Sequence, residues 1–386
     1  MPRMLFGRTL AAALFGVVQI FHLVMLSTGV AYAQAGARPG EVLGVWPLEG
    51  GAPAEARAYR IMYRSTGLAG EPIEVSGAVI FPSGPAPAGG RDVVAWAHPT
   101  SGVVDRCAPT RTPGMASRIP GLEAMLERGY VVVATDYPGL GTPGVHPYLI
   151  GVSEARAVID SVRAVRDLSA AAATRRFAVW GHSQGGHAAL FVGQLAASYA
   201  PELELVGVAA AAPATYLADL FMADRDTPAG RALSAMTLVS WSQLYNLPVA
   251  QVVDQRALPA IRRVASECID TLPALLKVLQ AQESLERTFL RADPLRLPAW
   301  RAIMNRNTPG QSPPGAPVFV AQGTADEVVP MRITRRFVRR LCAGGARVTY
   351  VSLDGVSHAL TALDSQLQAI SWIADRFRRK PVPNDC

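Results

Sequence analysis

Three polar residues, spread from the middle of the sequence to near its end, have the side chains that together turn a serine into a nucleophile. Ser183 is the central residue of a G-x-S-x-G sequence at 181–185, Asp326 follows an apolar run, and His358 lies near the carboxyl end. A serine hydroxyl attacks a carbonyl carbon efficiently only when a base takes its proton, and His358 can be that base. Asp326 would fix the imidazole tautomer and stabilise its charged form. The predicted chemistry is nucleophilic attack on a carboxylic acid derivative.

The residues on either side of Ser183 predict the elements that would position it. Residues 176–180 have the composition of a buried strand, and residues 187–196 that of a helix. A sharp turn between them would hold Ser183 in a strained backbone conformation, with its hydroxyl clear of the sheet. Gly181 and Gly185 leave room where strand and helix nearly touch. A chance G-x-S-x-G in a glycine-rich chain is the alternative, but strand, turn and helix together are typical of the nucleophile elbow of α/β-hydrolases.

The acid and the base each follow a predicted strand. Residues 316–323 precede Asp326, and residues 347–353 precede His358. The order serine, acid, histidine is that of the α/β-hydrolase fold. Asp354 is the main rival acid, but an Asp-Gly pair favours a turn.

Other acidic and histidine residues are assigned to other roles. Asp136 and His98 precede Ser183 in the chain, so we expect structural and positioning roles for them, and Glu327 is expected to point away from the site. His182 is expected to pack locally beside the nucleophile. His146 and His187 have no argument for membership of the triad.

An oxyanion hole needs two N–H donors near the nucleophile. Gln184 would offer its backbone N–H at a helix N-terminus, where the helix dipole favours negative charge. The second donor is expected in the loop after the strand at 92–98. Pro99 has no N–H. The backbone of Thr100 is therefore the first choice, and that of Ser101 the second.

Alternating strand and helix patterns define the predicted fold class. Residues 129–136 form a nearly continuous apolar run, as in a strand buried on both faces, and residues 152–169 have helical spacing with Ser153 as a candidate cap. Residues 59–64 and 73–82 predict an antiparallel edge hairpin. We therefore predict an α/β-hydrolase fold, with a mostly parallel central sheet and helices on both faces.

The amino-terminal residues predict export. Arg3 and Arg8 precede an apolar run, and an Ala-x-Ala site predicts cleavage after Ala33, so residues 1–33 are predicted to be a signal peptide. An uncleaved membrane anchor is the alternative, because the run is long. Removal of residues 1–33 takes away two arginines and no acidic residue, which lowers the formal charge from +7 to +5. The mature protein would be secreted or periplasmic, with residues 34–386 as one hydrolase domain.

Residues 215–305 change in character. Helix-like apolar segments there are interrupted by prolines, and the stretch is too long for a plain connection between two sheet strands. We predict an inserted helical cap. Candidate residues for lining an acyl pocket are Leu238, Trp241, Leu244, Tyr245 and Leu247, although ordinary packing against the sheet would account for most of them.

The remaining composition limits cofactors and partners. Four cysteines in an exported chain suggest two disulfides with three pairings open, between Cys107, Cys268, Cys342 and Cys386. No C-x-x-C motif or Cys/His cluster is present, so no metal site is expected, and no organic cofactor is implied. No dense basic run with interleaved aromatic residues is present, so nucleic-acid binding has little support.

The chain resembles the secretory lipases, the lipase-A-like group of α/β-hydrolases, over roughly Tyr59 to Cys386. The matching segments are Cys107-Ala108-Pro109, the D-Y-P-G-L-G of residues 136–141, Tyr148 with Glu154-Ala155, and the G-H-S-Q-G-G of residues 181–186. The resemblance implies hydrolysis of fatty-acid esters, a helical cap over the acyl site, and the disulfides Cys107–Cys268 and Cys342–Cys386. One departure is the loop at 98–100, which looks like the H-G-T type of many bacterial esterases.

Together these patterns predict a serine carboxylic-ester hydrolase, a lipase or esterase, that acts on medium- or long-chain acyl esters. Its substrate would be a small-molecule or lipid ester, with room for a transient contact with a lipid interface. An acyltransferase or a peptidase on the same fold is the alternative enzyme. A binding protein without chemistry is the alternative of another class, and the complete triad argues against it.

Overall fold

The computed structural model describes residues 38–286 and 289–386. The predicted signal peptide, residues 1–33, lies outside the described residues. Within the described part of the chain, no helix is both long and apolar enough to cross a membrane.

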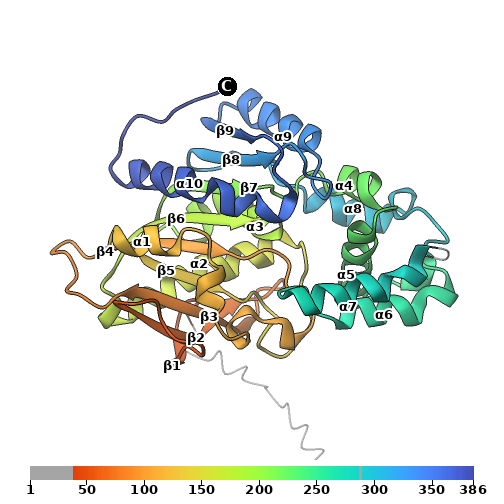
Figure 1. The fold of residues 1–386 in the computed structure, drawn as a ribbon, viewed down its shortest axis with the longest axis horizontal. Helices are drawn as coiled ribbons and strands as arrows, with labels where there is room; N and C mark the ends of the chain where they lie inside the picture. Colours follow the sequence, from red (N-terminus) through yellow and green to blue (C-terminus); the bar gives the residue numbers. More distant parts are fainter. Residues whose placement is uncertain (1–37, 287–288) are drawn as a thin grey trace, which may run out of the picture. The chain divides into compact units, whose positions relative to one another are not determined.

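A nine-stranded sheet forms the centre of the described chain (Figure 1). The six strands from β4 to β9 pair in parallel with one another, and β5 lies between β3 and β4. The strands β1, β2 and β3 pair antiparallel with their neighbours. The prediction of a mostly parallel sheet is therefore confirmed. In their order across the sheet the strands are β1 (Val42–Pro47), β2 (Ala56–Thr66), β3 (Pro72–Pro82), β5 (Val131–Thr135), β4 (Arg91–Ala97), β6 (Ala173–His182), β7 (Glu204–Ala211), β8 (Val318–Gly323) and β9 (Val348–Leu353).

The antiparallel hairpin of β2 and β3 pairs continuously from Ala56 opposite Pro82 to Thr66 opposite Pro72. The hairpin is present as expected, but it is not the edge, because β1 pairs with β2 outside it. β1 is half exposed and contains Gly44 and Pro47, so its sequence lacks the alternation that identifies a strand. This sequence gives no signal for the outermost strand.

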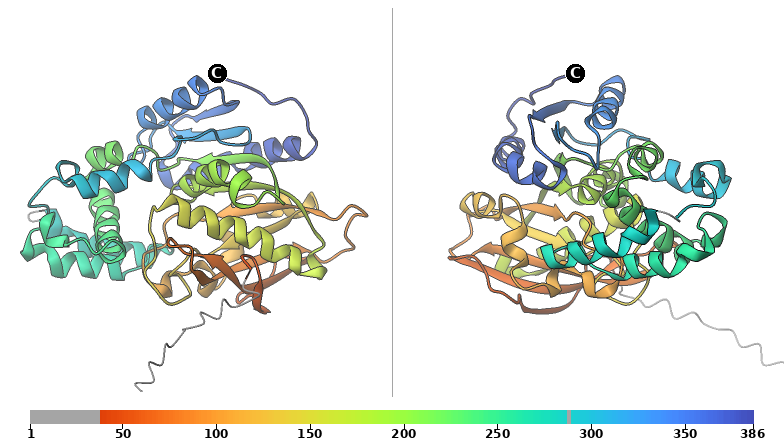
Figure 2. Two further views of the ribbon diagram at one scale, coloured as in Figure 1. Left: turned by 180° about the vertical axis from the view of Figure 1, so that it is seen from behind. Right: turned by 45° about the vertical axis from the view of Figure 1, so that its right-hand side comes forward.

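Helices cover both faces of the sheet (Figure 2). One face packs against α2 (Gly151–Asp167), α3 (Gln184–Tyr199) and α9 (Met331–Ala343), and the other against α1 (Leu122–Glu127) and α10 (Thr361–Phe377). Each face has its own buried apolar cluster. The prediction of helices on both faces is confirmed. Ser153 does not cap α2, because the chain turns into this helix at Ile150 and Ser153 is buried in the first turn.

Within the described residues, five α-helices lie between β7 and β8, beyond one end of the sheet (Figure 1). They are α4 (Leu217–Asp224), α5 (Pro228–Leu244), α6 (Leu258–Ser266), α7 (Leu272–Gln282) and α8 (Pro298–Arg306), and they share a third apolar cluster. Several prolines of this stretch occupy the first turn of a helix, where the missing N–H has no partner to lose. The stretch is thus built of short helices that pack on one another.

Candidate active site

Ser183 lies at the sharp turn between β6 and α3. Its backbone has φ +55° and ψ −115°, a strained conformation for a residue with a side chain. The Ser183 N–H donates to the carbonyl of Ala211 (2.9 Å), and its carbonyl accepts from the amide of Ala214 (3.2 Å). The exit of β7 therefore holds the turn in place.

The glycines of the turn are required by close approach of main chain to main chain. A Cβ on Gly181 would collide with the carbonyl oxygen of Gly185, and a Cβ on Gly185 would collide with that of Ala97. The neighbouring atoms belong to the backbone, so they cannot move aside without distorting the sheet. Helix α3 can lie this close to β6 and β4 only because both residues are glycine.

A chain of hydrogen bonds joins the three residues that the sequence predicts for the triad. His358 Nε2 lies 2.9 Å from Ser183 Oγ, and His358 Nδ1 lies 2.8 Å from Asp326 Oδ2. A carboxylate only accepts, so Nδ1 carries the hydrogen of the neutral ring. Nε2 is then free to accept the proton of the Ser183 hydroxyl. The structure thus brings together Ser183, Asp326 and His358 from three separate loops.

Asp326 collects hydrogen bonds from four donors. Its Oδ1 accepts from the amides of Val328 (2.9 Å) and Val329 (2.7 Å), and its Oδ2 accepts from Gln322 Nε2 (2.8 Å) as well as from His358. Burial alone would raise the pKa of Asp326, but the hydrogen bond and charge of His358, with the other donors, hold that pKa below its ordinary value. The carboxylate is therefore ionised and fixed in orientation. Sequence reasoning missed Gln322, which lies on β8, one residue before its end.

The rival acids make other contacts. Asp354 accepts a hydrogen bond from Thr324 (3.2 Å) in an exposed turn, where the following Gly355 has φ +69°. Glu327 is exposed. Asp136 is buried and accepts from Ser76 and Thr110, which ties β5 to its neighbours.

A large apolar cavity opens at Ser183 and His358. Its volume is about 640 Å³, and Thr100 and Trp96 border it on the side of the sheet. A second cavity of about 80 Å³ shares Ser183 with it. The apolar lining of the larger cavity comes mostly from α5, α7 and α10, through Ala229, Ala232, Leu233, Met236, Leu275, Val278, Leu279, Ala362 and Leu363.

The residues predicted to line an acyl pocket are mostly elsewhere. Leu238, Leu244, Tyr245 and Leu247 border neither cavity at Ser183, and Trp241 borders only the smaller one. They pack within or against the apolar cluster of the inserted helices. The face of α5 that borders the larger cavity is the one with residues 229, 232, 233 and 236. Ordinary packing, which the sequence analysis favoured for most of these residues, therefore accounts for four of them, and they pack among the inserted helices.

The predicted oxyanion donors lie next to Ser183. Gln184 is the first residue of α3, and Thr100 borders the larger cavity together with Ser183. Within the described chain, neither the Gln184 nor the Thr100 amide has a hydrogen-bond partner. The Thr100 hydroxyl is 2.9 Å from the Tyr148 hydroxyl, which fixes the loop. Ser101, the second choice, does not border either cavity at Ser183.

A buried polar network fixes the side chain of Gln184. Its Nε2 donates to His146 Nε2 (3.1 Å) and to Glu154 Oε1 (2.8 Å). His146 in turn donates from Nδ1 to the carbonyl of Pro138 (2.8 Å), and burial lowers the pKa of His146 to about 4. The ring is therefore neutral, with its tautomer set by the carbonyl.

His187 completes this network one helical turn after Ser183. Its Nδ1 lies 2.8 Å from Glu154 Oε2, and its Nε2 lies 2.8 Å from the carbonyl of Asn307. Both ring nitrogens thus face oxygen atoms, so the ring is held in orientation from both sides. Sequence reasoning assigned no role to His187 or His146. The position of His187, four residues after Ser183 and therefore one helical turn along α3, was the available signal in the sequence.

His182 supports the base from the other side. Its Nε2 lies 3.0 Å from the carbonyl of His358, to which a neutral ring donates. Burial, and then the neighbouring His358, lower the pKa of His182 to about 3. His182 is therefore a neutral donor that positions the His358 backbone, in agreement with the expected local role.

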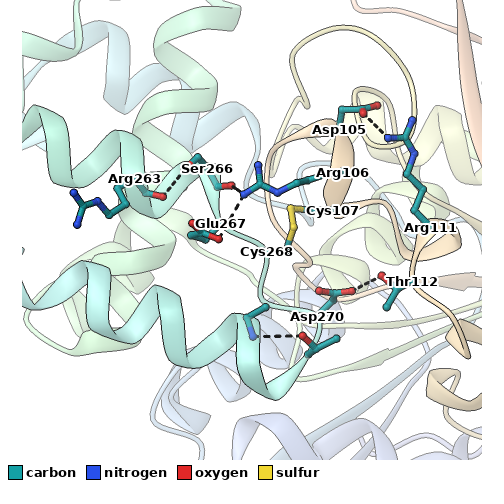
Figure 3. The surroundings of a disulfide bond; sticks show 12 residues. Asp105, Arg106, Cys107, Arg111, Thr112, Arg263, Ser266, Glu267, Cys268 and Asp270 are labelled. Carbon is teal, nitrogen blue, oxygen red and sulfur yellow. Dashed lines mark hydrogen bonds and ion pairs between the residues drawn. A yellow bond between two sulfur atoms is a disulfide. The ribbon is translucent and has the colours of Figure 1, made fainter.

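The disulfide Cys107–Cys268 joins the loop beside the site to the inserted helices (Figure 3). The residue after this disulfide, Ile269, donates its N–H to the carbonyl of Ser101 (2.8 Å). Asp270 accepts from the Thr112 hydroxyl (2.6 Å). The second disulfide is Cys342–Cys386. Both pairs are those that the resemblance implies.

No group of three or more metal-ligating side chains gathers anywhere in residues 38–286 or 289–386. The mostly parallel sheet with helices on both faces, together with the sharp turn that carries Ser183, defines an α/β-hydrolase. The chain belongs to the secretory lipase family, whose model matches residues 116–385.

Relatives of this chain bear the names of lipases. It is 25% identical to Lipase A of Arthroderma benhamiae, over 86% of this chain and 73% of that one. It is 27% identical to a secreted triacylglycerol lipase of Malassezia globosa, over 85% and 74%. A protein of Mycobacterium tuberculosis named a probable inactive lipase is 25% identical, over 86% and 76%. These relatives place the chain among lipase-type hydrolases of carboxylic esters.

Two solved structures share the fold. The structure of Candida antarctica lipase A superposes with a TM-score of 0.75 and 19% identity, covering 90% of this chain and 84% of that chain. The structure of the rice cell wall degrading esterase LipA from Xanthomonas oryzae superposes with a TM-score of 0.72 and 20% identity, covering 89% of this chain and 100% of that chain.

Proposed function

We propose that this protein is a secreted serine carboxylic-ester hydrolase that cleaves medium- or long-chain acyl esters. The observation that carries the proposal is the hydrogen-bonded series Asp326, His358 and Ser183, which ends at an apolar cavity of about 640 Å³. A cavity of this size and lining fits an acyl chain better than a polar or peptidic group.

The proposed reaction runs through an acyl-enzyme. His358 Nε2 takes the proton of Ser183 as Oγ attacks the ester carbonyl, and the imidazolium then protonates the leaving alcohol. Asp326 stabilises the imidazolium. Water, deprotonated by the same ring, releases the acid. The amides of Gln184 and Thr100 would bind the oxyanion, and each such donor contributes on the order of 3 kcal/mol to the transition state.

The first test is hydrolysis of p-nitrophenyl esters from acetate to palmitate, by the native protein and by Ser183→Ala. We expect kcat for decanoate to fall by about 10³-fold or more in the variant, with a native preference for the longer chains. Equal activity in both proteins would remove Ser183 as the nucleophile. A native preference for acetate would keep the mechanism and change the substrate class.

A binding protein without chemistry is the second candidate, because one relative is named a probable inactive lipase. An active-site phosphonate that labels the native chain but not Ser183→Ala would exclude this candidate. An acyltransferase or a peptidase would be recognised by its products, when alcohols or peptides are supplied with or in place of the ester.

Export is part of the proposal. The family and its secreted relatives fit an extracellular location, as do two disulfides. We propose that residues 1–33 are the signal peptide and that residues 215–305 form a cap over the acyl site. Intact mass measurement of the exported protein should give a chain that begins at Gln34, and a mass that includes residues 1–33 would indicate an uncleaved anchor.

A further inference from the structure

Asp224, the last residue of α4, is a buried carboxyl group that the proposed mechanism does not use. Its Oδ1 is fully buried and has no hydrogen-bond partner within the described chain, and its side chain makes no ion pair there. The neighbouring Arg231 is held by Gln282 and Glu286 instead. Burial, and then the charge of Asp326, raise the pKa of Asp224 to about 7. A buried acceptor without a donor is unfavourable in a folded protein and calls for an explanation.

Asp224 is one of the residues that line the smaller cavity, whose volume is about 80 Å³. That cavity also reaches Ser183, and it shares Leu233 and Val328 with the larger one. An ester bound at Ser183 would therefore be in reach of two spaces of very different size. Since one water needs about 10–15 Å³ of such volume, the smaller space holds a group of about five to eight heavy atoms.

We propose that the larger cavity takes the acyl chain and that the smaller one takes a short, hydroxyl-bearing alcohol group, whose hydroxyl donates a hydrogen bond to Asp224. The proposal rests on the proposed ester hydrolysis and specifies its substrate. An alcohol such as glycerol with one acyl chain contributes five heavy atoms beyond the ester oxygen, which fits the volume. A glycerol that carries further acyl chains does not fit. The preferred substrates are therefore monoesters of small polyols with a longer acid.

The test compares 1-decanoylglycerol with pentyl decanoate, dispersed in the same detergent. The two esters share the acyl chain, and their alcohol groups have equal numbers of heavy atoms, so the ratio of their kcat/KM values isolates the hydroxyls. We expect Asp224→Leu, which keeps the side-chain shape, to lower the ratio of glyceryl to pentyl ester by about 10-fold, as for loss of one hydrogen bond. Asp224→Asn keeps an acceptor and should lower the ratio by about 3-fold.

Asp226→Asn is the matched control, because this acid lies on the same turn but is exposed. Its ratio should equal that of the native protein. The thermal midpoint of Asp224→Leu should be equal to or above the native value, since an unpartnered buried carboxyl is replaced by an apolar group. If Asp224→Leu fails to fold, the proposal is judged on the ratio of glyceryl to pentyl ester measured for Asp224→Asn.

If both Asp224 variants keep the native ratio of glyceryl to pentyl ester, the proposal is overturned. It is also overturned if kcat/KM falls by the same factor for both esters, because an equal fall indicates a structural role. A further pair of esters, p-nitrophenyl 3-hydroxybutanoate and p-nitrophenyl pentanoate, carries the hydroxyl on the acid instead of the alcohol. If the Asp224 variants change only the kcat/KM ratio of this pair, the acyl group lies in the smaller cavity, and the proposal is overturned. Failure of the proposed function is distinguishable, because Ser183→Ala would then cleave both decanoates at the native rate.

Discussion

The carboxylate of Asp326 accepts hydrogen bonds from two backbone amides, an amide side chain and His358. Three of these donors hold the carboxylate in place whether or not the imidazole is charged. Gln322 is itself oriented, because Thr334 donates to its Oε1 (2.7 Å). When the ring gains a proton, the acid is already aligned with the new charge, so little reorganisation is needed in the reaction.

For Asp326→Asn we expect kcat for p-nitrophenyl decanoate to fall by about 10³- to 10⁴-fold at pH 8. An amide keeps one acceptor for the backbone donors but no longer stabilises the imidazolium or fixes its tautomer. Steady-state hydrolysis measures the loss. Glu327→Gln is the control and should behave as the native protein, since Glu327 is exposed. A larger loss in Asp354→Asn than in Asp326→Asn would assign the acid to Asp354.

Residue types and chain order suffice to nominate Ser183, Asp326 and His358, because each follows a strand with a recognisable apolar run. The network around Gln184 could not be predicted in the same way. The hydrogen-bond partners of Glu154, Gln184 and His187, lie 30 and 33 residues away in the sequence. The carbonyl of Asn307, which faces His187, lies 120 residues from it. No local pattern in a single sequence encodes such distances, since they depend on how α2, α3 and α8 pack.

At the scale of elements, the inserted helices are attached to the loop that carries Thr100. The Cys107–Cys268 disulfide closes 161 residues, and the next residue, Ile269, donates its amide to Ser101. Gly102 packs so closely on Cys107 that a Cβ there would overlap the sulfur. The position of this loop therefore depends on the attachment of the inserted helices.

We expect the double variant Cys107→Ser, Cys268→Ser to lose about 10-fold in kcat/KM for p-nitrophenyl decanoate, because the Thr100 amide is less firmly placed. It should also unfold at a lower temperature, since closing so long a loop is worth about 4–5 kcal/mol. Kinetics and a thermal melt measure the two effects. The double variant Cys342→Ser, Cys386→Ser is the control and should lose stability but keep kcat/KM. Equal kinetics for both double variants would contradict this role of the first disulfide.

The elements of the core were largely predictable, whereas those of the insertion were not. Buried strands such as β5 appear as apolar runs, and α2 and α10 have clear helical spacing. In the insertion, the prolines that look like interruptions mark helix starts at Pro228 and Pro298. The orientation of α5 could not be predicted, because this helix has buried residues around most of its circumference.

For the described molecule as a whole, exposed leucines lie on two of the helices that border the larger cavity. Leu272 and Leu276 lie on α7 and are 69% and 57% exposed, and Leu367 on α10 is 67% exposed. Both helices border the cavity, through Leu275 and Leu363 among others. Exposed apolar side chains beside an apolar cavity are typical of contact with another apolar phase. On the proposed function, that phase would be the surface of a lipid aggregate.

The triple variant Leu272→Ser, Leu276→Ser, Leu367→Ser should lose about 5- to 10-fold in the hydrolysis of emulsified long-chain esters, because less apolar area leaves water on adsorption. Its kcat/KM for dissolved p-nitrophenyl butyrate should stay native. A pH-stat and a spectrophotometric assay give the two rates. Leu68→Ser, on the β2–β3 turn, is the control. Parallel losses in both assays would indicate damage to the cavity instead of a lost contact surface.

β7 and β8 pair in parallel although the whole insertion lies between them in the sequence, and this order of elements has a consequence for biosynthesis. The serine is made midway along the chain, but the acid and the base arrive only with the loops after β8 and β9. A polypeptide that is still being synthesised, or that has crossed a membrane only in part, has a serine with no base to activate it. On the proposed mechanism, the order of the chain thus delays activity until the last strands are in place, so an incomplete chain would not cleave the lipids of the producing cell.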